Sequence, residues 1–473
     1  MRYRIEKDLL GQRQVPAEAY YGIETLRGKE NFEITKRGIC RQMIKALAIV
    51  KKAAAKANVD ALNIDEKVGK AIMLACDEIL NGRLHGQFVT DLIQGGAGTS
   101  MNMNANEVIA NRANELLGGK KGVYDFVHPN DHVNFGQSTN DVIQTAGKIA
   151  IVKQLKKLQV ELKKLYNAYL NKATEFKDVI KMGRTHLQEA LPLRLGQEFS
   201  AYASALNRDM KRIDVAIEAL LEVNMGATAI GTSLNANEKY RKKVIYYLNK
   251  FSGEQIKPAK DLIDATRNFD TFGQASSTLK LLALNLSKTA SDLRLMASSG
   301  SNGFSEITLP HVQPGSSIMP GKYNPVVPEM VNQVCFYVIG LDVTITKAIE
   351  AGQLELNVFG PIILMSLFEQ ITTLRRATRT FHNLAISGLI ANTTKYKTDN
   401  SIYLITALSP HLGHEEACNV VNEAISSEKT IKQVLLDHHI LSEEIINMVL
   451  DESNMTNPGI ALENILKEKK EQE

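Results

Sequence analysis

The sequence predicts a mainly α-helical chain with a central bundle of five long helices. Residues 148–182 contain neither glycine nor proline, and apolar residues recur there at alternating spacings of four and three. This is the period of one face of an α-helix. Helices of this length that follow one another along a chain form a bundle. Four further stretches with helical character lie at 195–220, 261–297, 328–351 and 360–386.

Three domains are expected along the 473 residues, which exceed the length of one typical compact core. Residues 1–140 mix short elements with turns and are expected to form an N-terminal, mixed but mostly helical domain. The long helices fill residues 141–391. Shorter segments separated by turn signals then predict a small C-terminal helical domain over residues 392–473.

The fourth and fifth long stretches are apolar nearly all round. Val331, Val334 and Phe336 belong to the fourth stretch, and Ile362 and Leu364 belong to the fifth. A helix that is apolar on every side must be buried on every side. Because five helices in one chain cannot easily provide this, the pattern predicts association between subunits around the bundle.

Composition excludes several classes of protein. Hydrophobic residues make up 44% of the chain and charged residues 23%, and the net charge is only +4, so neither nucleic acid nor a membrane surface is an expected partner. The four cysteines are far apart in the sequence and form no C-x-x-C pair. The N-terminus lacks the apolar run of a signal peptide, so a cytoplasmic location is expected.

One loop, residues 299–328, stands out because it is rich in glycine, proline and serine and has no helical or strand period. Five residues separate Gly315 from Gly321 and Tyr323 follows Lys322, so the loop does not match the phosphate-binding motif. Met319 stands where a nucleophile elbow needs its second glycine. On composition alone, an ordinary surface loop and an anion site with a possible nucleophile both remain open.

Three more polar stretches lie where helical segments meet. Residues 94–107 combine three glycines with Thr99, Ser100 and three asparagines. Residues 137–141 read Gln-Ser-Thr-Asn-Asp, and residues 183–188 contain Thr185 and a lone histidine. Helix capping explains one Ser or Thr in such a position but not whole runs of polar side chains. The asparagines, which are poor helix formers, predict a buried hydrogen-bond network.

Metal chemistry is disfavoured by the histidines and carboxylates. His411 and His414 have a spacing that could grip a metal, but Pro410 and Gly413 suit a turn and a helix start better. No H-E-x-x-H motif and no carboxylate cluster occurs. The remaining set of Thr, Ser, Asn, His and Lys is a cage of neutral donors with one cation, which suits a small dicarboxylate.

The residues from Gly315 to Pro325 resemble the GSSxMPxKxNP signature of the aspartase and fumarase superfamily, and the other three stretches resemble its remaining site regions in the same chain order. The resemblance covers essentially the whole chain. It implies a homotetramer with a twenty-helix core, active sites shared by three subunits, and no cofactor or metal. It also implies reversible deamination of L-aspartate to fumarate and ammonia by anti elimination, a reaction of aspartate metabolism.

The same resemblance assigns the catalytic roles. Ser316 is expected to take the C3 proton, which leaves extra negative charge on the neighbouring carboxylate as an aci-carboxylate. Preorganised donors must stabilise that charge. Lys322 and His186 complete the catalytic set, and Glu329 is expected to support His186. The substrate-binding residues implied are Ser138, Thr139 and Ser317 for the β-carboxylate, Thr185 and Asn324 with Lys322 for the α-carboxylate, and Thr99 and Asn140 with His186 for the amino group.

Two alternatives stay open beside this assignment. The nearest is fumarate hydratase, which adds water in place of ammonia, and a non-catalytic scaffold that kept the fold is more remote because every site residue is present. Two positions depart from the family pattern: Tyr323 replaces a valine and Gln144 replaces a proline. Neither is assigned to substrate, so they affect expectations about loop motion and not about activity.

Overall fold

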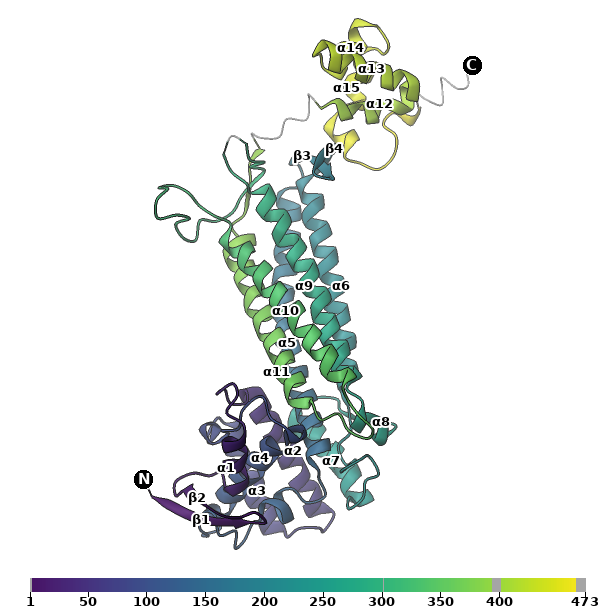
Figure 1. Ribbon diagram of the computed structural model, residues 1–473. Coiled ribbons are helices and arrows are strands. Elements are labelled where there is room, and N and C mark those ends of the chain that lie inside the picture. Colours follow the sequence, from purple (N-terminus) through teal and green to yellow (C-terminus); the bar gives the residue numbers. More distant parts are fainter. Residues whose placement is uncertain (1, 301, 394–400, 465–473) are drawn as a thin grey trace. The chain divides into compact units, whose positions relative to one another are not determined.

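The computed structural model describes residues 2–300, 302–393 and 401–464 and confirms a mainly α-helical fold (Figure 1). Contacts divide the chain into two compact units. The three-domain division expected from the sequence stays a prediction. Unit 1 comprises residues 1–162, 208–284 and 333–377, and unit 2 comprises residues 163–207, 285–332 and 378–473.

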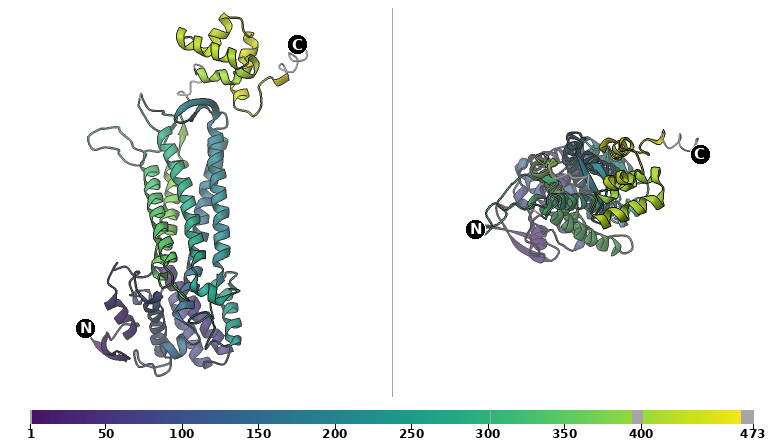
Figure 2. Two further views of the ribbon diagram at one scale, coloured as in Figure 1. Left: turned by 45° about the vertical axis from the view of Figure 1, so that its right-hand side comes forward. Right: turned by 90° about the horizontal axis from the view of Figure 1, so that it is seen from above.

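The five long helices each contribute residues to both units, and they are labelled in Figure 1 and seen from two further directions in Figure 2. Their existence was predicted from the sequence. Their bounds are α5 (Thr139–Glu175), α6 (Leu195–Leu220), α9 (Asp270–Met296), α10 (Val326–Glu350) and α11 (Gly360–Phe381).

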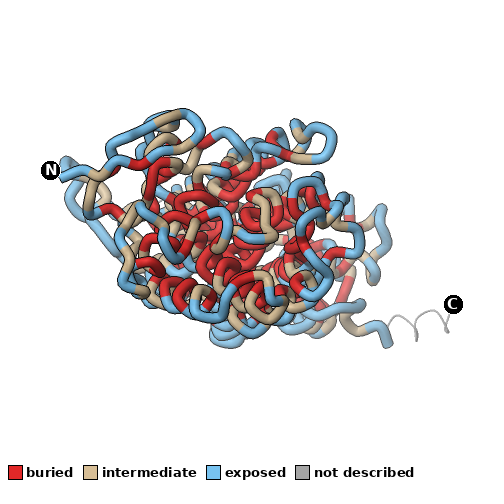
Figure 3. The backbone as a smooth tube through the Cα atoms, turned by 90° about the horizontal axis from the view of Figure 1, so that it is seen from below, coloured by how far each residue is buried: buried red, intermediate tan, exposed pale blue. Residues whose placement is uncertain are grey.

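Side-chain contacts within unit 1 hold these helix segments together. Asp342 of α10 is buried and accepts hydrogen bonds from Ser276 Oγ at 2.7 Å and Lys280 Nζ at 2.6 Å, both on α9. Gln370 of α11 donates to Ser276 Oγ at 3.1 Å. A Cβ placed on Gly147 of α5 would lie 2.5 Å from a Leu364 methyl, so this glycine permits close approach of α5 and α11. Figure 3 shows the buried positions in red where helices face one another.

Shorter elements complete unit 1. The polar residues of α4 hold the surrounding loops: Asn104 donates to Gln87 O at 2.9 Å, and Asn114 donates to Val127 O at 2.6 Å. Of the three asparagines singled out in the sequence, Asn102 and Asn104 are hydrogen-bonded to surrounding segments, whereas Asn106 Oδ1 is buried without a partner among the described residues, so the predicted network is confirmed in part. The elements are β1 (Tyr3–Asp8), β2 (Gly11–Pro16), α1 (Ile23–Asn31), α2 (Arg41–Asp60), α3 (Glu66–Leu80), α4 (Thr99–Leu116), α7 (Glu238–Ser252), α8 (Leu262–Arg267), and the short parallel pair β5 (Glu222–Val223) and β6 (Lys257–Pro258).

Unit 2 contains two antiparallel strand pairs and a group of short helices around their own apolar core, which includes Leu408, Val434 and Ile446. Its elements are β3 (Ile180–Thr185), β4 (Gln188–Arg194), β7 (Ile307–Thr308), β8 (Ile390–Ala391), α12 (Ile405–Leu412), α13 (His414–Ser427), α14 (Ile431–Asp437), α15 (Glu443–Val449) and α16 (Glu452–Met455).

Two helix boundaries differ from the sequence-based prediction. The first long helix begins at Thr139 and ends at Glu175, because residues 180–185 pair with β4 as strand β3. The third is interrupted at Asn268, whose extended backbone (φ −101°, ψ 137°) separates α8 from α9. Pairing and local backbone conformation override helical periodicity at both places.

The apolar helix α10 is only partly covered within one chain. Phe336 is 62% exposed and Val343 is 59% exposed. By length and composition α10 could also cross a membrane, a test that core helices of soluble proteins pass as well. The buried, hydrogen-bonded Asp342 near its middle shows that this side of α10 packs against protein.

Candidate active site

The turn before α5 carries the first group of predicted site residues, and a buried carboxylate fixes its backbone. Asp141 accepts hydrogen bonds from the backbone N–H groups of Ser138 at 2.9 Å, Gly226 at 3.1 Å and Thr228 at 3.0 Å. Burial raises the pKa of Asp141 to about 6. Ser138 Oγ accepts from Asn140 N at 3.2 Å, so this serine caps the helix as well.

The glycine-rich turn before α4 lies next to this group. Gly98 has φ 94°, and a Cβ added there would lie 3.2 Å from Ile143 of α5. Thr99 is exposed, and its Oγ1 donates to Gly96 O at 2.7 Å. One turn further along α4, Asn102 Nδ2 donates to Thr139 Oγ1 at 3.2 Å. The structure thus brings the Thr99 and Ser138–Asn140 regions together in unit 1.

A lysine that the sequence analysis did not single out lies behind these residues. Lys51 of α2 has no exposed surface, and its Nζ donates to Asn134 Oδ1 at 2.8 Å and Gln137 Oε1 at 3.0 Å. Asn134 Oδ1 also accepts from Asn102 at 3.2 Å. Burial lowers the pKa of Lys51 to about 7, although the charge of Asp141 opposes this shift. The sequence feature that could have identified Lys51 is its position as a lysine on the apolar face of a helix.

Gln144, which stands where the family pattern has a proline, packs in the same region of unit 1. Gln144 is buried on α5, and its Nε2 donates to Thr266 O at 2.7 Å. It therefore anchors α5 to α8 and does not reach the turn that carries Ser138. Asn140 in turn donates to Ala229 O at 2.6 Å, which ties the site turn to the loop that follows β5.

The second group lies in unit 2 on the β3–β4 hairpin. Thr185 pairs with Gln188, so His186 and Leu187 form a two-residue turn with φ values of 54° and 60°. Positive φ at two non-glycine residues is strained and is often found at functional sites. Thr185 and His186 are both exposed in the single chain. Arg184, one residue earlier, forms an ion pair with Glu306.

The third group is the loop that precedes α10, which closes on itself. Gly315 N donates to Lys322 O at 2.8 Å, and Asn324 Nδ2 donates to Gly315 O at 2.8 Å. A Cβ on Gly315 would lie 2.6 Å from Lys322 O, so only glycine fits this close approach. Ser316 Oγ accepts from Ile318 N at 3.2 Å. Ser317 and Lys322 are exposed, whereas Ser316, Asn324 and Glu329 are half-buried.

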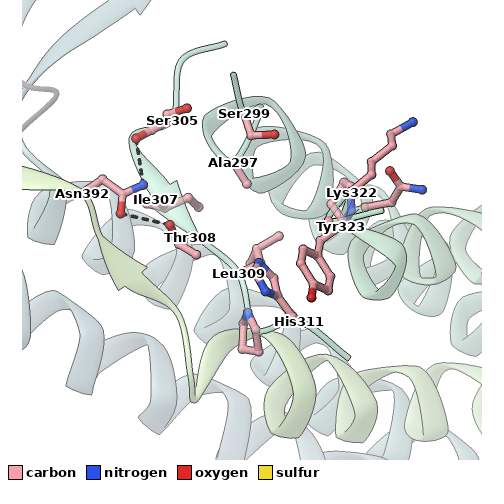
Figure 4. Close-up of a pocket in the computed structure, with 14 residues that line it drawn as sticks. Ala297, Ser299, Ser305, Ile307, Thr308, Leu309, His311, Lys322, Tyr323 and Asn392 are labelled. Carbon is pink, nitrogen blue, oxygen red and sulfur yellow. Dashed lines mark hydrogen bonds between the residues drawn. The ribbon is translucent and has the colours of Figure 1, made fainter. Parts of the chain in front are cut away.

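A cavity of about 400 Å³ in unit 2 is bordered by this loop (Figure 4). Lys322 and Asn324 line it, so two predicted anion-binding residues border the same space. The rings of His311 and Tyr323 stack with centroids 3.7 Å apart and planes within 4°. On another wall, Asn392 donates to Ser305 O at 2.9 Å and accepts from Thr308 at 3.0 Å.

The predicted site residues thus fall into two sets, one in each unit. Thr99, Ser138, Thr139 and Asn140 belong to unit 1, and the hairpin and loop residues belong to unit 2. The expected pairing of His186 with Glu329 stays a prediction. Among the described residues, no group of three or more His, Cys, Asp or Glu side chains could hold a metal ion. His411, whose spacing from His414 could have suited a metal, has its Nε2 2.9 Å from the backbone oxygen of Ala461.

Comparison with known proteins decides the family. A family model described as "Lyase" matches residues 11–340, and one described as "Fumarase C C-terminus" matches residues 404–457. Aspartate ammonia-lyase from Bacillus subtilis is 51% identical over 98% of both chains. The chain belongs to the aspartase and fumarase superfamily. Other superfamily members named aspartate ammonia-lyase are 48% identical in Helicobacter pylori, over 96% of this chain and 98% of that one, and 45% identical in Escherichia coli, over 96% of each.

Solved structures of superfamily members share the fold. The cobalt-bound fumarate lyase:delta crystallin from Brucella melitensis is 44% identical, with a TM-score of 0.94 over 97% of this chain and 100% of that chain. The class II fumarase from Schistosoma mansoni is 34% identical, with a TM-score of 0.94 over the same shares. The family predicted from the loop signature is therefore confirmed.

Proposed function

We propose that this chain is an aspartate ammonia-lyase, a carbon–nitrogen lyase that converts L-aspartate reversibly to fumarate and ammonia. The observation that carries the proposal is the 51% identity to a named aspartate ammonia-lyase over 98% of both chains. The site geometry supports it, because hydroxyl and amide donors in unit 1 and an exposed lysine in unit 2 provide the donor set that a dicarboxylate needs.

In the proposed mechanism Ser316, as an alkoxide, removes the C3 proton of aspartate. The electron pair of the broken C–H bond moves onto the β-carboxylate, which becomes an aci-carboxylate held by Ser138, Thr139 and Ser317. When this intermediate collapses, the electron pair held on the aci-carboxylate forms the C2–C3 double bond, and the C2–N bond breaks with its own electron pair leaving on ammonia. Donors aimed at the charged oxygens lower the barrier to the first step.

The amino and α-carboxylate groups are assigned to the remaining residues. Thr99, Asn140 and His186 surround the departing amino group, and Thr185, Lys322 and Asn324 hold the α-carboxylate. Ser316 needs activation, since an unperturbed serine hydroxyl is a weak base. Closure of the loop over substrate brings the backbone amides and Lys322 toward Ser316, which stabilises its alkoxide.

The proposal includes a homotetramer in which three subunits build each site. Two observations support it: α10 exposes Phe336 and Val343 in the single chain, and Thr185 and His186 point into solvent on their hairpin. Covering the apolar helices with a second copy buries area that water would otherwise contact. The four cysteines are free thiols, which fits the cytoplasm as the proposed location.

Ser316→Ala tests the proposed chemistry. We expect kcat for release of ammonia from L-aspartate to fall about 10²- to 10⁴-fold, because the variant lacks the proton acceptor. Ser426→Ala, at an exposed serine in α13, is the control and should keep wild-type activity. Near-normal turnover by Ser316→Ala would refute its role. Fumarate formation from L-malate and none from L-aspartate would instead identify a fumarase.

A further inference from the structure

Unit 1 contains a second cavity, of about 380 Å³, where the loop before α2 meets α5 and α11. None of the residues assigned to aspartate lines it. Six of its lining residues carry the argument below, and we call the cavity that they line the arginine pocket. These residues are Arg37, Gln154, Phe368, Glu369, Arg375 and Arg376.

The arginine pocket has an excess of positive charge. Arg37 Nη2 donates to Glu369 Oε1 at 2.9 Å, so one of the three guanidinium groups is paired with a carboxylate. Within the described residues Arg375 and Arg376 have no such partner, and Arg375 Nε is buried without an acceptor. Both side chains line the cavity, and the planar fork of a guanidinium group can bond two oxygens of a carboxylate or phosphate at once.

A second unsatisfied group lies in the same pocket. Gln154 of α5 is only 3% exposed, and its Oε1 has no hydrogen-bond donor among the described residues. A buried carbonyl oxygen without a donor costs free energy, which a ligand N–H or O–H would recover. The pocket therefore offers donors for an anion together with an acceptor for a donor group.

The rim of the arginine pocket is fixed before any ligand arrives. Asp91 accepts from the backbone N–H groups of Thr35 and Lys36, each at 2.8 Å, and bridges to Gly38. Leu92 N donates to Arg37 O at 3.1 Å. Phe368, only 8% exposed, supplies an apolar wall. A preformed cavity loses little conformational freedom when it binds.

We propose that the arginine pocket binds a small organic anion, separately from the active site. A carboxylate or phosphate group of this ligand bonds to Arg375 and Arg376, and a hydroxyl or amine of the ligand donates to Gln154 Oε1. The volume of the cavity suits a ligand of a few carbon atoms. Carboxylates and phosphates share this recognition chemistry, so the experiment separates them.

Isothermal titration calorimetry on the full-length protein tests the pocket with two matched probes, D-glycerate and sn-glycerol 3-phosphate. Both have three carbons and two hydroxyls and differ in the anionic group. We expect at least one to bind, and the tighter one identifies the anionic group. Propionate and methyl phosphate lack a hydroxyl for Gln154 and should bind less tightly. If neither hydroxylated probe binds at millimolar concentration, the proposal is overturned.

Variants assign the binding to these residues. The double variant Arg375→Gln/Arg376→Gln should raise the Kd of the bound probe at least about tenfold, because charge-assisted hydrogen bonds are lost. Arg379→Gln, an exposed arginine on α11 outside the pocket, should leave Kd unchanged. Arg376 is exposed, so Arg376→Gln alone tests the site even if the double variant does not fold. Unchanged Kd in Arg376→Gln and in Gln154→Met would place the probe elsewhere.

Discussion

Lys51 is a cation without exposed surface, held by two amide oxygens behind the turn that carries Ser138 and Thr139. A buried ammonium group is costly unless it is hydrogen-bonded. Hydrogen bonds link Lys51 to Thr139. Asn134 Oδ1, which accepts from Lys51, also accepts from Asn102 Nδ2 at 3.2 Å, and Asn102 Nδ2 donates to Thr139 Oγ1 at 3.2 Å. We therefore infer that Lys51 is a positioning residue, which orients the Thr139 hydroxyl that the proposed function assigns to substrate.

Replacing Lys51 by methionine should lower kcat/KM about tenfold, since Thr139 loses its fixed orientation. Stability gives a second readout. The folded-state pKa is about 7 and the ordinary value is 10.5, so between these pH values the unfolded chain binds more protons. The free energy of unfolding of the wild type therefore rises with pH relative to Lys51→Met.

Thermal unfolding at several pH values between 7 and 9 measures this difference. As pH increases, the melting temperature of the wild type should rise relative to that of Lys51→Met. Lys70→Met, at an exposed lysine of α3, is the control and should track the wild type at every pH. A difference in melting temperature between wild type and Lys51→Met that does not change with pH would contradict a lowered pKa of Lys51 in the folded protein.

At the scale of elements, the loop before α10 is attached through an aromatic stack at a position where the family signature has valine. Tyr323 lies face to face with His311, with ring centroids 3.7 Å apart. The segment between them carries Ser316, Ser317 and Lys322. Because stacking of aromatic rings contributes about 0.5–1.5 kcal/mol beyond burial, this contact biases where the loop rests.

Tyr323→Val should release the loop, and Tyr323→Phe should retain the stack. Limited proteolysis measures the effect, since a protease cuts segments that detach from the fold. We expect cleavage within residues 312–322 to be faster in the valine variant and unchanged in the phenylalanine variant. Equal cleavage rates in all three proteins would show that the stack does not hold the loop.

How far the elements were predictable depended on the kind of signal. The long helices followed from apolar periodicity, and the hydrogen bonds of Asn102 and Asn104 on α4 followed from three asparagines that helices disfavour. The hairpin turn at His186 and Leu187 was not predicted. Both residues have positive φ there, and neither is a residue type that usually adopts this backbone conformation. Lys51 was also missed, since its role depends on Asn134 and Gln137, more than eighty residues away.

At the scale of the whole molecule, the proposed site residues are divided between the two units, and α10 is only partly covered within one chain. The hydroxyls that the proposed function assigns to substrate belong to unit 1, and Ser316, its proposed proton acceptor, belongs to unit 2. The loop around Ser316 forms hydrogen bonds within itself. Phe336 of α10 is 62% exposed. Assembly of copies resolves both features at once if residues from different subunits meet in one site.

Mixing two inactive variants tests this shared site. Thr139→Ala and Ser316→Ala each remove a residue that the proposal takes from a different subunit. Co-expressed in equal amounts, they should form tetramers in which about a quarter of the sites receive both native residues, because subunits assemble at random. Ammonia release from L-aspartate should recover to that extent. Thr139→Ala mixed with Asn140→Ala is the control: both residues come from one turn of one chain, so every site keeps one defect and activity stays at the level of the separate variants. Recovery in neither mixture would mean that each site is built within a single subunit.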